Sequence, residues 1–118
     1  VIDDDAEVRE IMAAWVEADG CRPLSVDSAD SALRVASGRS VAVALCDVQM
    51  PTHDGFWFIE RAQAAHPDMA VVLVTGVHDV DWALRGLQQG VVDYLLKPFD
   101  QRSLSRALEN GMRQHRLR

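Results

Sequence analysis

The chain has 118 residues, of which 48% are hydrophobic, so it is long enough for one compact domain that buries a core without disulfides or structural metals. The formal net charge of -6 argues against a general nucleic-acid binder, because the only clustered basic residues stand in the terminal RQHRLR. No apolar stretch approaches the length needed to span a bilayer and no signal peptide precedes the first motif, so we expect a cytoplasmic domain that contacts neither membrane nor DNA.

The chain opens on VIDDD, two apolar residues followed by three aspartates, Asp3, Asp4 and Asp5. Carboxylates this close repel one another and lose solvation where they are buried, so a positive group is expected among them, and a metal ion is the candidate. Asp5 is also a suitable N-cap for the helix that follows. The short apolar start resembles the inside of a strand, which suggests that residues 1–118 are one domain from a longer protein.

The first helix is predicted by apolar residues at helical spacing, which we expect to face the core: Val8, Ile11, Met12, Trp15 and Val16. Gly20 is its predicted stop. A weak strand, PLSV, and a shorter helix from the N-cap Ser28 to Gly38 come next. Two cysteines, Cys21 and Cys46, lie in separate stretches without metal-ligand spacing and are expected to be free thiols in a reducing compartment.

The rest of the chain repeats the alternation of strand and helix. VAVALCDV at 41–48 is predicted to be a buried strand, and after the turn MPTHDG a helix runs from Phe56 to Pro67. A second buried strand covers 69–76, a helix covers 79–90, a strand covers 91–96, and a final helix starts at Asp100. In the helix at 79–90, four residues are expected to point inward: Val80, Ala83, Leu84 and Leu87. Five alternations with apolar strands predict an α/β fold with a doubly wound, five-stranded parallel sheet covered by helices on both faces.

Polar residues end the predicted strands. Asp3 and Asp4 end the first, Asp47 the third, Thr75 the fourth and Lys97 the fifth. Function in doubly wound sheets gathers at the carboxyl ends of the strands, so these side chains should meet. Three carboxylates suit Mg²⁺, a lysine can pair with a carboxylate or a phosphoryl oxygen, and a threonine hydroxyl can donate to a transferred group.

Among these acids Asp47 is the best candidate for a nucleophile, because it ends the predicted central strand and is followed by a turn that leaves its face open. A carboxylate beside Mg²⁺ and lysine can attack a phosphoryl group to give an acyl phosphate. Asp3 and Asp4 are better placed to hold the metal.

Four segments in this order and spacing, IDDD, CDVQMPTHDG, VLVTG and YLLKPF, resemble the receiver domain of two-component response regulators of the chemotaxis-regulator type over essentially the whole chain. The resemblance implies a flavodoxin-like (βα)5 fold with strand order 2-1-3-4-5. It implies that Asp47 is the phosphoacceptor. It also implies that Mg²⁺, for which Mn²⁺ is a plausible substitute, is held by Asp3, Asp4, Asp47 and the backbone carbonyl of Gln49.

The resemblance further implies that Lys97 pairs with the phosphoryl group, that Thr75 is the switch hydroxyl and that Tyr94 is a rotating switch aromatic. The Lys97-Pro98 bond should be cis, as it is in the family. Gln49 stands where many relatives have Asn or Arg, and Gly76 where Ala is common, so the rate of dephosphorylation and the order of that loop are open.

The implied partners are a sensor histidine kinase or a phosphotransfer protein, an output domain or other partner that the switched surface controls, and a second copy bound through the fourth helix, fifth strand and fifth helix; whether an output domain follows Arg118 is left open. Such a domain catalyses its own phosphorylation but is not a multiple-turnover enzyme. Three alternatives stay open. An aspartyl-phosphate phosphatase would need a second acid two residues after the nucleophile, where Gln49 stands; a receiver-like binding module would never be phosphorylated; and a flavin carrier would need a phosphate-cradling loop where the first strand leads into acids.

Overall fold

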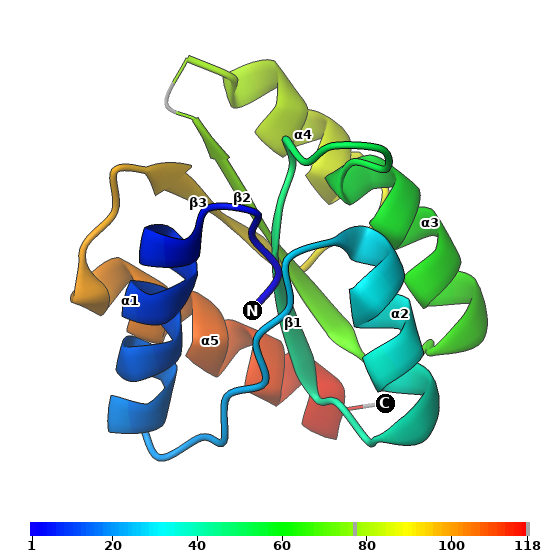
Figure 1. Ribbon diagram of the computed structural model, residues 1–118, viewed down its shortest axis with the longest axis horizontal. Helices are drawn as coiled ribbons and strands as arrows, with labels where there is room; N and C mark the ends of the chain where they lie inside the picture. The colour runs from blue at the N-terminus through cyan, green and yellow to red at the C-terminus, as the bar shows by residue number, and fades with distance from the viewer. Residues whose placement is uncertain (77, 118) are drawn as a thin grey trace.

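Helices and strands alternate along most of the chain (Figure 1). The computed structural model describes residues 1–76 and 78–117, so Val77 and Arg118 lie outside the described residues. The elements in these ranges are α1 (Ala6–Ala18), α2 (Ala29–Gly38), β1 (Val43–Asp47), α3 (Gly55–Ala65), β2 (Ala70–Gly76), α4 (Val80–Gln88), β3 (Asp93–Lys97) and α5 (Gln101–Arg116).

The sheet is parallel, with β2 between β1 and β3. The segment at Ile2 joins this sheet through one isolated parallel bridge to Cys46 of β1. The segment at Val26 in turn forms one isolated parallel bridge to Ile2. The predicted α/β fold with a parallel sheet is therefore confirmed, whereas the five-stranded order 2-1-3-4-5 is not. The physical reason is local: the acidic turn begins immediately after Ile2, and Pro23 in the predicted strand PLSV has no N–H to give to a ladder.

Helices cover both faces of the sheet, with α1 and α5 on one face and α2, α3 and α4 on the other (Figure 1). Each face has its own core. Met12 of α1 and Leu104 of α5 are buried with Val72 and Val74 of β2 on the first face. Phe58 and Ile59 of α3 are buried on the second with Leu73, whose side chain points the opposite way from its strand neighbours.

Short polar side chains start most of the helices. Asp5, Ser28, Asp54 and Asp100 each accept a hydrogen bond from a backbone amide in the first turn of α1, α2, α3 and α5, respectively. Gly20, with φ of 85°, follows the end of α1, which confirms its predicted place. Among the described helices, none combines the length and apolar character needed to cross a membrane. The two cysteines are free, as predicted.

Two predictions of burial were wrong. Ile11 of α1 is 49% exposed, although its neighbours Met12 and Val16 are buried. The large apolar residues of α4 also face outward, because the helix packs on the sheet through small residues instead; the exposed ones are Val80, Leu84 and Leu87, and the buried ones are Ala83 and Gly86. A Cβ at Gly86 would lie 2.7 Å from Leu73 Cδ2, which shows how closely α4 approaches β2.

The start of α3 is pressed against the end of β1. A Cβ added to Gly55 would lie 2.7 Å from the backbone oxygen of Asp47 and 2.9 Å from the Cα of Val48, so backbone would have to move to admit it. We expect Gly55→Ala to lower the free energy of unfolding by about 1–3 kcal/mol, measured by urea denaturation. Gly38→Ala is the control, because nothing lies within 4 Å of a Cβ there, and it should leave stability unchanged or slightly higher. Equal losses in both variants would contradict the close approach at Gly55.

Candidate functional site: an acidic cavity at the carboxyl edge of the sheet

The predicted site residues converge at the carboxyl ends of the strands. A cavity of about 410 Å³ is lined by nine residues: Asp3, Asp4, Asp5, Asp47, Val48, Gln49, Thr75, Gly76 and Lys97. Asp47 is the last residue of β1, and Lys97 is the last residue of β3. Parallel strands bring residues distant in sequence to one edge, so the topology accounts for the cluster.

The three consecutive aspartates have different surroundings. Asp3 is fully buried, and its Oδ1 accepts the backbone N–H of Asp5 at 2.9 Å. Asp4 is exposed at the cavity. Asp5 is the N-cap of α1, where its Oδ1 accepts the amides of Glu7 and Val8, as expected from the sequence.

Lys97 is the cation that lies between the acids. Its Nζ lies 3.2 Å from Asp3 Oδ2 and 3.4 Å from Asp47 Oδ2. Partial burial lowers the pKa of Lys97, but the charges of Asp47 and Asp3 outweigh this, and the net result is a raised pKa. The ammonium is therefore retained at neutral pH and can pair with an anion that enters the cavity.

The pKa of Asp47 is raised from its ordinary value of 3.8 to about 6. Burial is the main cause, because it disfavours the charged form, and the charge of Asp3 adds to it, while Lys97 acts in the opposite direction. One lysine does not neutralise the acids of this cavity. A further positive charge would stabilise the ionised carboxylate.

This raised pKa makes stability depend on pH. The folded chain holds the Asp47 proton more tightly than the unfolded chain, so stability from this group falls as pH rises from about 4 to about 6. With metal chelated, we expect Asp47→Asn to raise the free energy of unfolding by about 1–3 kcal/mol at pH 7.5 and by much less at pH 4. Denaturant titrations at both pH values measure the difference.

Asp100 provides a control in which the pKa shift has the opposite sign to that of Asp47, because hydrogen bonds from Ser103 lower the pKa of Asp100. Its contribution is present above its unfolded pKa of about 3.8 and is lost only as pH falls below that value, so Asp100→Asn should lower stability to nearly the same extent at pH 7.5 and at pH 4. An effect of Asp47→Asn that is the same at both pH values would contradict the raised pKa.

The donor set of the cavity suits a hard divalent cation. One carboxylate oxygen from each of Asp3, Asp4 and Asp47 lies within 4.8 Å of the others. Oxygen ligands of this kind, completed by water, are those that Mg²⁺ prefers. Gln49 lines the same cavity, which is compatible with the expected use of its backbone carbonyl.

Thr75 and Tyr94, the two expected switch residues, lie in opposite environments. Thr75 is 1% exposed, and its Oγ1 has no hydrogen-bond partner among the described residues, so its hydroxyl is buried at the cavity with its bonding capacity unused. Tyr94 of β3 is 37% exposed and is absent from the cavity lining. Thr75 is thus brought to the site, and Tyr94 is not.

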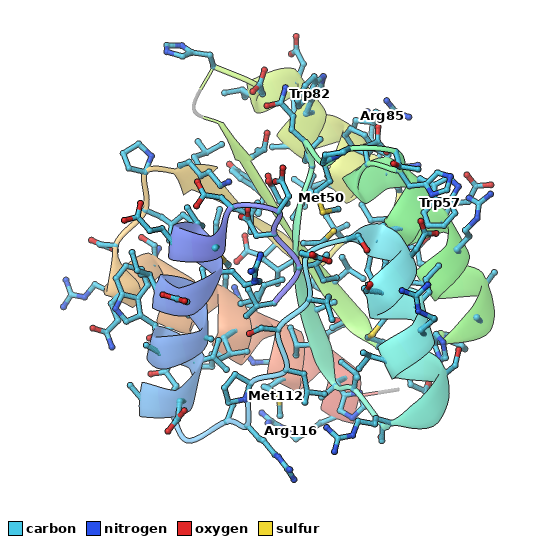
Figure 2. All side chains as sticks on the ribbon, viewed as in Figure 1. Met50, Trp57, Trp82, Arg85, Met112 and Arg116 are labelled. Carbon is cyan, nitrogen blue, oxygen red and sulfur yellow. The ribbon has the colours of Figure 1, made fainter. Side chains whose placement is uncertain are left out.

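Sequence reasoning missed one contributor to the site. Arg9 Nη1 donates to the backbone oxygen of Asp3 at 2.8 Å, an arrangement for which a lone arginine in a helix gives no sequence signal. Close to the site, Trp82 is half-buried against Phe56. Figure 2 shows it with Arg85 on α4, near Met50, and these three line a second cavity beside the first.

Comparisons with known proteins identify the family of the chain. Residues 1–109 match the family model of the response regulator receiver domain. The response regulator protein FleR of Pseudomonas aeruginosa is 34% identical over 104 residues, covering 88% of this chain and 22% of FleR. The transcriptional regulatory protein FixJ of Bradyrhizobium diazoefficiens is 32% identical, covering 97% of this chain and 56% of FixJ. The chain thus spans about a fifth to just over half the length of these relatives.

Solved structures give the same result. The crystal structure of a response regulator receiver domain protein from Clostridium thermocellum matches with a TM-score of 0.91 and 30% identity, covering 98% of this chain and 94% of that one. The receiver domain of NtrX from Brucella abortus, at 24% identity and a TM-score of 0.91, shows the same fold. The matched length and the residues gathered at the acidic cavity lead to one conclusion: the chain belongs to the family of response regulator receiver domains of two-component signalling.

Proposed function

We propose that this domain accepts a phosphoryl group on Asp47 from the phosphohistidine of a sensor histidine kinase or phosphotransfer protein. The observation that carries the proposal is the surroundings of the Asp47 carboxylate. It is 6% exposed at a cavity, lies 3.4 Å from a lysine ammonium, and is grouped with two further carboxylates. A buried acid with a raised pKa in a cleft is a typical functional group, because its environment is arranged for a change of charge.

In the transfer step, an Asp47 carboxylate oxygen attacks phosphorus and forms a P–O bond. The N–P bond of the donor phosphohistidine breaks, and its electron pair returns to the imidazole nitrogen, which takes a proton from solvent. No atom is oxidised or reduced. Lys97 lies within reach of Asp47 and pairs with the phosphoryl oxygens as they arrive. Asp3 keeps Lys97 in place through the second arm of the same ion pair.

Mg²⁺ is the proposed cofactor, with Mn²⁺ as a substitute, held by the carboxylates of Asp3, Asp4 and Asp47 and the backbone carbonyl of Gln49. When bound, the ion offsets the negative charge that accumulates on the acids and the phosphoryl oxygens. The chain's own contribution is to group these donors.

Phosphorylation then changes the surface of the domain. The buried hydroxyl of Thr75, which has no hydrogen-bond partner in the described part of the chain, donates to the new phosphoryl oxygens, and Tyr94 changes its position on β3. The face affected is made by α4, β3 and α5, and it carries exposed apolar residues: Val80, Leu84, Leu87 and Tyr94. Clustered apolar side chains favour a partner, so we propose this face as the surface that controls an output domain or forms a homodimer. The domain acts as a signalling module rather than as a multiple-turnover enzyme.

Incubation with acetyl phosphate tests the chemistry without knowledge of the kinase. We expect intact-mass spectrometry to show one phosphoryl adduct in Mg²⁺ or Mn²⁺ and none in chelator, because the acids repel an anionic donor when no cation offsets them. Failure to form an adduct with Mg²⁺ present would contradict the proposal and would favour a protein-binding module that is never phosphorylated.

A further inference from the structure

Helix α4 begins differently from the other described helices. At the start of α1, α2, α3 and α5 the N-cap side chain accepts a backbone amide, whereas the N-cap of α4, Asp79, makes no side-chain hydrogen bond to its helix. Aspartate is as good an N-cap as any residue, and the helix dipole attracts its charge. Something other than capping therefore determines where this carboxylate lies.

The Asp79 carboxylate lies over Gly76. A Cβ built on Gly76 would be 2.9 Å from Asp79 Oδ2, so the carboxylate fills the space that a side chain at position 76 would take. The backbone supports this arrangement, because Asp79 N donates to the carbonyl of Gly76 at 2.9 Å. Glycine is the residue that leaves room for the carboxylate there.

Gly76 also lines the acidic cavity, next to Thr75. The Asp79 carboxylate is thus packed on a wall residue of a site that already groups three carboxylates. The hydroxyl of the buried neighbour Thr75 has no hydrogen-bond partner among residues 1–76 and 78–117, so it does not hold the Asp79 carboxylate in place. A phosphoryl group on Asp47 would replace the single charge of the carboxylate with about two negative charges, and these would repel the Asp79 carboxylate that lies over Gly76. The amides of Asp81 and Trp82, at the second and third positions of α4, are the donors that an N-cap side chain uses. The Trp82 amide already donates to the backbone oxygen of Asp79 at 2.9 Å, so the Asp81 amide is the donor to which the carboxylate would move.

We propose that Asp79 is a positioning residue whose carboxylate has two positions. It lies over Gly76 when Asp47 is unmodified, and it accepts a hydrogen bond from the Asp81 amide at the N-terminus of α4 when Asp47 is phosphorylated. This inference rests on the proposed function and adds to it the route by which charge at Asp47 reaches α4. Because coupling is reciprocal, any change that moves Asp79 onto α4 also favours the phosphorylated state. The carboxylate can lie over residue 76 because glycine has no side chain there.

The first test needs no phosphorylation. Gly76→Ala places a methyl group 2.9 Å from Asp79 Oδ2, closer than such atoms pack, and the end of a flexible side chain can move away. We expect exchange of the Asp81 amide, followed by NMR, to slow about fivefold, the factor that a typical N-cap gives. In the double variant Gly76→Ala with Asp79→Ala, this slowing should disappear. Equal slowing with and without Asp79 would mean that Gly76→Ala acts by stiffening the backbone, and would overturn the inference, as would no slowing in the single variant.

The second test uses acetyl phosphate and Mg²⁺, with the adduct counted by mass in every sample. Exchange of the amide of residue 81 should slow on phosphorylation of the natural chain but not of Asp79→Ala. Asp81→Asn is the matched control, because it removes a charge from the same turn of α4 without touching Gly76, and it should respond like the natural chain. Slowing in phosphorylated Asp79→Ala would overturn the inference. If no adduct forms, the proposed function fails, and the Gly76→Ala comparison still decides the role of Asp79.

Discussion

Asp47→Asn is expected to take up no phosphoryl group from acetyl phosphate in Mg²⁺. The carboxamide that replaces the carboxylate is neutral and is a poor nucleophile, so the attacking oxygen is lost although the cavity keeps its shape. The fold should persist, because the substitution removes a buried charge whose pKa is raised to about 6 by burial and by Asp3. Intact mass measures the adduct, and circular dichroism verifies the fold.

Asp54→Asn is the control for this variant. Asp54 lies seven residues later, is exposed, and caps α3 by accepting the amide of Trp57, which asparagine can also do. Its adduct should form as in the natural chain. Stoichiometric labelling of Asp47→Asn would show that another residue accepts the phosphoryl group.

Asp3→Asn and Asp5→Asn should differ sharply in Mg²⁺ binding, although the two residues are separated by one position. Asp3 is fully buried and is one of the three carboxylates grouped in the cavity, so we expect its loss to weaken Mg²⁺ binding by at least about tenfold, measured by calorimetry. The Asp5 carboxylate is occupied by the amides of Glu7 and Val8, and asparagine is an equal cap, so affinity there should stay the same.

Equal losses of Mg²⁺ affinity in the two variants would mean that the ion responds to the summed charge of the triplet rather than to a defined site. Titration at high and low salt separates the two cases, since a diffuse charge effect is screened and a ligand bond to a buried carboxylate is screened much less.

Most of the site follows from the sequence because of one property of the fold. Parallel strands end at the same edge, so the residues that end them, such as Asp47, Thr75 and Lys97, could be placed together before any coordinates were known. The apolar runs that predict β1 and β2 are buried on both faces, and their short length and flanking turn residues favour strands over helices.

The remaining features depend on packing that the pattern does not encode. Periodicity gives α4 an apolar stripe, but the helix turns Leu84 outward, because Gly86 and Ala83 allow a closer approach to the sheet. The exposure of Tyr94 likewise cannot be predicted from the sequence, since a tyrosine in a strand is found both in cores and on surfaces. Gly76 shows the same limit. Its structural role depends on its contact with the Asp79 carboxylate, and this contact is known only from the coordinates.

The most direct measurement is to locate the phosphoryl group itself. After labelling with acetyl phosphate and Mg²⁺, reduction with borohydride converts an aspartyl phosphate to homoserine, and peptide mass spectrometry identifies the changed residue. We expect homoserine at position 47 alone, with the conversion absent when chelator replaces Mg²⁺. Homoserine at Asp3, Asp4 or Asp54 instead, or an adduct that borohydride does not reduce, would contradict the assignment of Asp47 as the phosphoacceptor.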